Sequence, residues 1–153
     1  MKKIINFLQV GVCILLGVST LSWAGIKNNN TKTPIFPASL GFSVGVDSPA
    51  IKVGNFVFIS GQGAGSTKNS KDLDAQIEEA FKKLRMVANA AGGDLDDIVK
   101  INVYLADLSD YPLLNKVMSQ YFKKPYPARS TVGVSALPKD HRIEVDAVML
   151  VRK

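Results

Sequence analysis

The most regular pattern of apolar and polar residues lies between positions 73 and 91. Apolar residues there recur three or four positions apart, and most of the charged residues stand between them. This spacing places the apolar side chains on one face of a helix. Asp72 or Ser70 can cap the start of that helix, and Gly92-Gly93 can end it. We therefore expect an amphipathic helix over residues 73–91.

A shorter apolar pattern of the same kind follows Asp110. One helical face would carry four residues, namely Leu114, Val117, Met118 and Tyr121. Ser109 or Asp110 can cap this second helix, and Pro125 and Pro127 prevent it from continuing.

Several other segments alternate apolar residues with polar or small ones, which is typical of half-buried strands. These segments are residues 50–53, 56–60, 98–105, 128–135 and 142–151. Gly54-Asn55, between the first two, is typical of a two-residue hairpin turn. Strands combined with two helices predict an α+β fold, in which both helices pack on one face of a mixed sheet. The other face of the last strand would carry Arg142, Glu144 and Asp146, which suits an interface with another chain.

The first 24 residues differ from the rest of the chain. Lys2 and Lys3 precede a long apolar run, and small residues stand at positions 22 and 24. This order is typical of a secretory signal peptide, and the competing interpretation is a membrane anchor. We expect cleavage after Ala24, a periplasmic or secreted protein, and no stable membrane anchoring afterwards. Residues 25–40 would form a flexible tether before a single domain over residues 41–153.

Composition narrows the possible function classes. The formal net charge of +6 falls by two when Lys2 and Lys3 are removed with the leader. Basic and acidic residues alternate along the rest of the chain, so the sequence has no basic stripe for binding nucleic acid. The only cysteine, Cys13, lies in the leader, and the only histidine is His141. Since one histidine without cysteine cannot supply the usual ligands of a transition metal, no metal is expected.

Two charged residues stand on strand-like segments near the C-terminus. Arg129 and Glu144 lie on the last two predicted strands, which a short turn containing Pro138 joins. Charges on such segments are costly unless a partner or a ligand satisfies them. A guanidinium can bind a carboxylate through two parallel hydrogen bonds, and a glutamate can accept a proton or orient a water molecule. The two residues therefore predict either a site for a small acid or a buried ion pair.

The residues around this pair resemble the signature of a known family. Pro127-Ala128-Arg129-Ser130 is followed by Leu137-Pro138-Lys139-Asp140 and then by Ile143-Glu144. Ile59-Ser60-Gly61-Gln62 and Asn115 stand upstream in matching order. On these motifs, the sequence from about residue 43 to residue 153 is identified as a member of the Rid family, also called RidA or YjgF.

The resemblance implies a chorismate-mutase-like fold and a homotrimer with its sites in clefts between subunits. Enzymes of this family hydrolyse reactive 2-imino and 2-enamino acids to 2-keto acids and ammonia, and the resemblance implies no metal or organic cofactor. It also implies that Arg129 binds the substrate carboxylate and that Glu144 positions or activates the attacking water. Four further residues, which would offer polar groups to the imine end or brace the cleft, are Thr131, Gly61, Asn115 and Ser60.

The sequence differs from the best-studied enzymes of the family just before the first hairpin. Those enzymes carry Gly-Pro-Tyr there, with the tyrosine in the site, whereas this chain has Val46-Asp47-Ser48-Pro49. Three functions therefore stand as hypotheses: deamination of 2-imino acids, binding of small carboxylates in the periplasm without catalysis, and cleavage of RNA. The third is disfavoured, because the sequence has neither a basic stripe nor an exposed array of aromatic residues.

Overall fold

The computed structural model describes residues 31–38, 46–64 and 72–152. Three expected features lie outside these ranges: the signal peptide over residues 1–24, the first part of the tether and the alternative cap Ser70. In the described part of the chain, no helix is both long and apolar enough to cross a bilayer.

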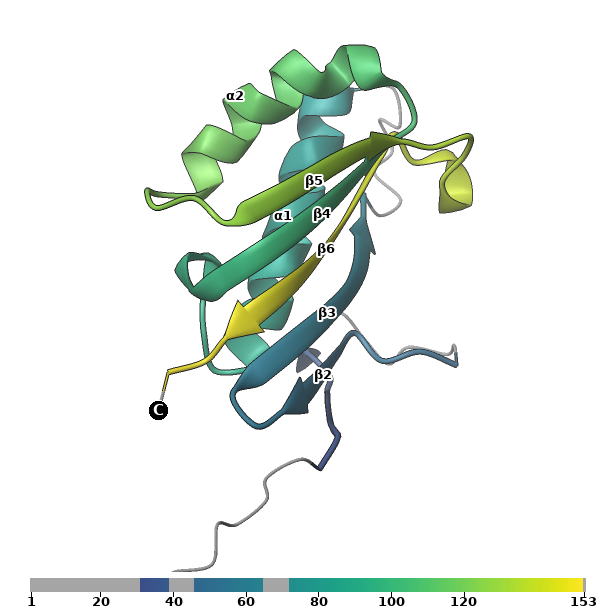
Figure 1. Cartoon of the computed structure of the whole chain (residues 1–153). Helices are drawn as coiled ribbons and strands as arrows, with labels where there is room; N and C mark the ends of the chain where they lie inside the picture. Colours follow the sequence, from purple (N-terminus) through teal and green to yellow (C-terminus); the bar gives the residue numbers. More distant parts are fainter. Residues whose placement is uncertain (1–30, 39–45, 65–71, 153) are drawn as a thin grey trace, which may run out of the picture.

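The described strands form one six-stranded sheet. In chain order they are β1 (Thr33–Ile35), β2 (Ala50–Val53), β3 (Phe56–Gly63), β4 (Ile98–Leu105), β5 (Ala128–Gly133) and β6 (Ile143–Leu150). They lie in the order β1-β2-β3-β6-β4-β5, and β4 and β5 are the one parallel pair among them. The mixed sheet expected from the sequence is confirmed, and β5 forms one of its edges (Figure 1).

The two long helices are α1 (Leu73–Ala90) and α2 (Tyr111–Tyr121). Figure 1 shows α1 crossing behind the sheet and α2 running beside β5. Asp72 caps α1 as expected, since its carboxylate accepts a hydrogen bond from the backbone N–H of Ala75 at 3.4 Å. The predicted α+β fold with two helices is therefore confirmed.

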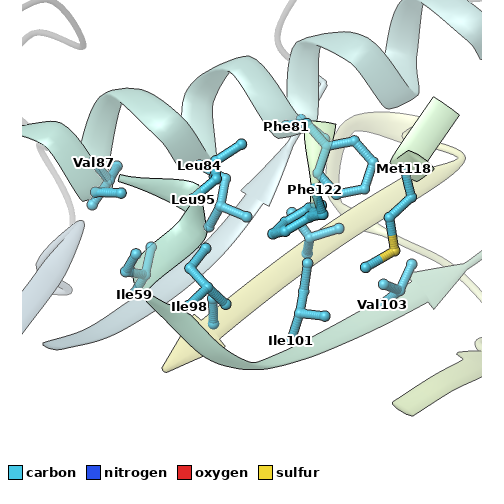
Figure 2. Packing of buried hydrophobic residues seen from close by; sticks show 14 of the residues in the cluster. Ile59, Phe81, Leu84, Val87, Leu95, Ile98, Ile101, Val103, Met118 and Phe122 are labelled. Atoms are coloured by element: carbon cyan, nitrogen blue, oxygen red, sulfur yellow. The ribbon is translucent and has the colours of Figure 1, made fainter. Parts of the chain in front are cut away.

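One hydrophobic core fills the space between the helices and the sheet. The apolar stripe of α1, which includes Phe81 and Leu84, packs against strand residues such as Ile101 and Val103 (Figure 2). Burial of each of these large side chains stabilises the fold by roughly 1.5–3 kcal/mol. In β6 the buried residues are Ile143, Val145, Ala147 and Met149, as the alternation predicted.

Three residues of the predicted tether form a strand. Thr33–Ile35 pairs with Ala50–Lys52 of β2, so the prediction of a flexible tether is wrong for this part of residues 25–40. Pro34 fits here because β1 lies at the edge of the sheet, where one side of the strand needs no hydrogen-bond donor. Pairing with a distant edge cannot be recognised from a local composition that is polar and contains proline.

An ion pair joins the start of α2 to the start of β6. Asp110 precedes α2 but makes no capping hydrogen bond, and both of its carboxylate oxygens lie 2.7 Å from Nη2 of Arg142. Arg142 therefore binds Asp110 and does not continue the row of Glu144 and Asp146 that the alternation predicted. Its backbone N–H donates to Oε1 of Gln76 in α1 at 2.9 Å. These contacts hold α1, α2 and β6 together.

We expect Asp110→Asn to lower the free energy of unfolding by about 2 kcal/mol, because Arg142 would stay partly buried without a countercharge. Urea denaturation followed by circular dichroism measures the change. Glu78→Gln is the matched control, because it breaks an ion pair with Lys82 at 2.8 Å whose two side chains are well exposed. The control should change stability by less than about 0.5 kcal/mol. Equal losses in the two variants would contradict a structural role for Asp110.

Candidate active site

A hollow opens between α2 and the edge strand β5. Its volume is about 530 Å³, and its lining residues are Tyr111, Asn115, Met118, Ser119, Tyr126, Pro127, Arg129 and Thr131. We call it the Arg129 hollow. Three of the site residues expected from the sequence, Asn115, Arg129 and Thr131, meet in it.

Arg129 lies on the face of β5 that α2 covers. Its Nη2 donates a hydrogen bond to the hydroxyl of Tyr111 at 2.7 Å, and its Nη1 contacts the sulfur of Met118 at 3.1 Å. Its Cζ also lies 5.1 Å from the centre of the Tyr111 ring, a cation–π distance. No carboxylate in the described ranges comes within ion-pair distance of Arg129. The guanidinium is therefore oriented by neutral groups, and its charge remains available to an anion.

Thr131 and Asn115 add uncharged polar groups to the wall of the same hollow. The Thr131 hydroxyl oxygen is buried and has no hydrogen-bond partner in the described part of the chain. The Asn115 side chain is exposed on α2 and lines the hollow. A buried hydroxyl without a partner is costly, so a ligand or a water molecule that donates to it or accepts from it would be stabilised here.

The other three expected site residues, Ser60, Gly61 and Glu144, form a second group, which we call the Glu144 group. The carboxylate of Glu144 packs directly on Gly61, so closely that a Cβ on Gly61 would overlap it. The Ser60 hydroxyl donates to the carbonyl of Pro49 at 3.0 Å and so braces the segment that follows Asp47. Asp47 itself is exposed. The strand continues beyond the predicted segment 56–60, because β3 runs through a bulge to Gly63.

The Arg129 hollow and the Glu144 group lie on opposite faces of the sheet. Arg129 pairs with Ile101 in β4, which is buried under the helices. Glu144 pairs with Tyr104 and alternates with the buried Val145. Paired residues on neighbouring strands point to the same face, and successive residues point to opposite faces. In addition, β4 separates the two strands. The hypothesis of an ion pair between Arg129 and Glu144 within one chain is therefore wrong.

Hydrogen bonds on the open face distinguish its two carboxylates. Asp146 accepts hydrogen bonds from Nδ2 of Asn102 at 2.8 Å and from the hydroxyl of Tyr104 at 2.7 Å. The hydrogen bond to Asp146 raises the pKa of Tyr104 above its usual value, and burial and the charge of Glu144 act in the same direction. Glu144 accepts no hydrogen bond from any other described residue. Glu144 is thus the carboxylate on this face that can hold water or a substrate.

Two lining residues carry a signal that sequence reasoning missed. The sequence pattern places Met118 on the apolar face of the second helix and assigns no role to Tyr111. Tyr111 lies four residues before Asn115, and Met118 lies three residues after it. This spacing places all three on one side of a helix. That spacing could have identified them as neighbours of the expected site. Tyr126, which precedes the arginine motif, does line the hollow.

In the described ranges, no group of three His, Cys, Asp or Glu side chains is placed to hold a metal ion. What the two groups offer is a cation for a carboxylate, a buried hydroxyl and a carboxylate that can accept a proton.

The family model described as "Endoribonuclease L-PSP" matches residues 43–151 of this chain. Among curated relatives, the 2-iminobutanoate/2-iminopropanoate deaminase of Dermatophagoides farinae is 35% identical over 123 residues, which cover 78% of this chain and 93% of the relative. The human protein of the same name is 37% identical over 113 residues, which cover 71% of this chain and 82% of the relative.

Solved structures agree with these relatives. RidA from an Antarctic Psychrobacter is similar at a TM-score of 0.72 and 39% identity, covering 78% of this chain and 99% of that one. TdcF of E. coli, solved with bound serine, is similar at a TM-score of 0.71 and 29% identity, covering 79% of this chain and 100% of that one.

We expect the Arg129 hollow to bind small monocarboxylates, and Arg129→Ala to weaken that binding by about 10- to 150-fold. That range corresponds to the roughly 1.5–3 kcal/mol that a charged hydrogen bond contributes. Isothermal titration calorimetry with pyruvate measures the affinity. Arg85→Ala is the matched control, because Arg85 is well exposed on α1 and is not part of the hollow's lining. An unchanged affinity in Arg129→Ala would show that the anion binds elsewhere.

Proposed function

Since the chain belongs to the Rid (YjgF) family, we propose that it is a deaminase that hydrolyses 2-imino acids, and the 2-enamino acids that interconvert with them, to 2-keto acids and ammonia. The observation that carries this proposal is the Arg129 guanidinium, which borders the hollow and has no carboxylate partner among the described residues. A 2-imino acid supplies that carboxylate. Serine, which TdcF binds, also carries a carboxylate.

The residues of the two groups would divide the reaction between them. Arg129 binds the substrate carboxylate, and the Tyr111 hydroxyl fixes the plane of the guanidinium. The Thr131 hydroxyl gains a hydrogen-bond partner at the reacting end of the substrate. Glu144 holds the attacking water and accepts one of its protons. The imine carbon is already electrophilic, so orientation, water and proton transfer are sufficient for hydrolysis.

The cleft would be completed by a second copy of the chain. The Arg129 hollow and the Glu144 group face away from each other, so one chain cannot bring both to the same substrate. The open face also exposes apolar side chains, since Phe56 and Phe58 of β3 and Val132 of β5 are each about half exposed. Covering these residues with another copy removes apolar surface from water. A closed ring of three copies would pair each Arg129 hollow with a Glu144 group from its neighbour.

The chain would carry out this reaction outside the cytoplasm. This part of the proposal rests on the basic, apolar and small-residue order of positions 1–24. The remaining domain has no cysteine, which suits an oxidising compartment.

We expect the purified protein to release ammonia from a 2-imino acid generated in the assay by an amino-acid oxidase. Arg129→Ala should reduce kcat/KM by about 10- to 150-fold, because binding of the carboxylate is lost. Glu144→Gln should reduce kcat by about 100-fold or more, because the glutamine cannot accept a proton. Affinity for 2-keto acids without turnover would establish the carboxylate-binding function in place of the deaminase. Salt-sensitive RNA binding that survives Arg129→Ala would favour the nuclease.

Mixed oligomers test whether two copies complete each cleft. Arg129→Ala and Glu144→Gln should each have strongly reduced activity alone, but co-expression in equal amounts should restore full activity in about one quarter of the clefts. That fraction follows because each cleft draws Arg129 from one copy and Glu144 from another. An equal mixture of wild type with the double variant Arg129→Ala/Glu144→Gln is the reference, because one quarter of its clefts should also contain both intact residues. No recovery in oligomers shown by mass spectrometry to contain both variants would rule out the shared cleft.

Export predicts a mature chain that begins after Ala24 and has 129 residues, without the only tryptophan, Trp23. Mass spectrometry of the periplasmic fraction should find this species, and its fluorescence should show tyrosine emission alone. An intact N-terminus with tryptophan emission would contradict cleavage.

A further inference from the structure

The only histidine of the chain lies beside the Glu144 group. His141 precedes β6, and its imidazole packs on Gly63 so closely that a Cβ there would overlap Nδ1. Glu144 packs in the same way on Gly61. Gly61 and Gly63 flank the buried Gln62, so both glycines face the open side of the sheet. His141 and Glu144 therefore occupy neighbouring places on one face, each over a glycine that leaves room for it.

One residue separates the two glycines. Alternate residues of a regular strand lie roughly 6.6 Å apart, whereas two hydrogen bonds through one water span roughly 5.6 Å. Gly61 lies in the bulge between Ile59 and Gln62, where this spacing changes. A water shared by Glu144 and the imidazole is therefore part of the proposal made below.

The turn before His141 is shaped for this approach. Lys139 and Asp140 have φ values of 58° and 56°, in the left-handed region that side-chain-bearing residues rarely adopt. Such backbone strain is concentrated at functional sites, where the surrounding structure maintains it. His141 follows this turn directly, and its imidazole lies against Gly63.

The surroundings of the imidazole favour its neutral form. Nδ1 is buried and has no hydrogen-bond partner in the described ranges, so only Nε2 can exchange a proton with water. Burial lowers the pKa of His141, the positive charges of Lys83 and Lys139 lower it further, and the carboxylates of Glu144 and Glu79 oppose this shift. Lys83 is held near the ring, because its Nζ donates to the carbonyl of Gly63 at 3.1 Å.

We propose that His141 takes up and returns protons through the water that Glu144 holds, and so acts as the second proton-transfer group of the deaminase. This inference rests on the proposed function. His141 acts through the water and not on the substrate directly, so it is a positioning and relay residue.

The proton balance of the reaction explains the need for such a group. Water oxygen bonds to the imine carbon, and the π electrons of the C=N bond move to nitrogen. The C–N bond then breaks with its electrons going to nitrogen, while the C=O bond forms. Both protons of the water end on nitrogen, and ammonia leaves. Two protons must therefore be accepted and returned in each turnover.

The pH profile of imine hydrolysis tests the inference. His141→Gln preserves a polar side chain of similar size but cannot carry a proton at these pH values, so kcat should fall by about 10- to 100-fold. The acidic limb of the wild-type profile, set by protonation of His141 below pH 6.5, should disappear in the variant. His141→Asn provides a second variant in case the first does not fold. Unchanged kcat and an unchanged acidic limb in a folded variant would overturn the proposal.

Because His141 is the only histidine, its NMR titration reports its protonation without any assay of turnover. Its pKa should lie below 6.5 and fall further in Glu144→Gln, which removes an opposing negative charge. Glu78→Gln is the control, because Glu78 pairs with Lys82 on the exposed side of α1 and should leave the titration unchanged. A titration insensitive to Glu144 would reject the link between the two residues. If the wild type shows no imine hydrolysis at all, the proposed deaminase function is rejected. The NMR titration then still tests the link between His141 and Glu144 independently.

Discussion

The alternation of side chains across β4, β5 and β6 is the constraint on which the site depends. Ile101 and Val103 must be buried under the helices, and the strand register ties Arg129 and Thr131 to the same face. The same register ties Glu144 to the open face. Shifting β6 by one residue would expose its buried apolar row, so the place of Glu144 on the open face is as firmly specified as the core. A chain built in this way presents two separate groups of candidate site residues.

The position of the arginine depends in turn on α2, which supplies the groups that orient it. Tyr111 stands at the first position of that helix, directly after the ion-paired Asp110. The contact between Asp110 and Arg142 therefore fixes the end of α2 from which the Tyr111 hydroxyl reaches Arg129. The packing of α2, the ion pair between Asp110 and Arg142 and the hydrogen bond from Arg129 to Tyr111 thus together fix the position of the Arg129 guanidinium. Neutral partners orient the guanidinium without cancelling its charge, which is the condition for binding an anion in a partly buried place.

Separation of the charges also affects the proton chemistry. An arginine beside a carboxylate lowers the basicity of that carboxylate, and in this fold the two approach each other only if copies assemble. In an assembled cleft the arginine would therefore oppose general-base catalysis until the substrate carboxylate binds it. In our proposal, the imidazole of His141, which packs on Gly63, provides a base that the arginine does not contact within its own chain. Assembly, substrate binding and proton transfer would then be coupled through the same open face.

The sequence by itself determined both helices, most strands, the two-residue turn at Gly54 and the family motifs that contain all six expected site residues. Those features depend on local periodicity or on contiguous motifs, and periodicity is set by the geometry of the backbone. Only the tertiary structure decided which of the six lie together. It brought Asn115, Arg129 and Thr131 to one hollow, placed Glu144 on the opposite face, and added Tyr111 and His141 as neighbours. It also turned Thr33–Ile35 into an edge strand. The physical reason is that strand order and register are set by burial of the whole sheet. No local segment of the sequence predicts which strand lies between two others.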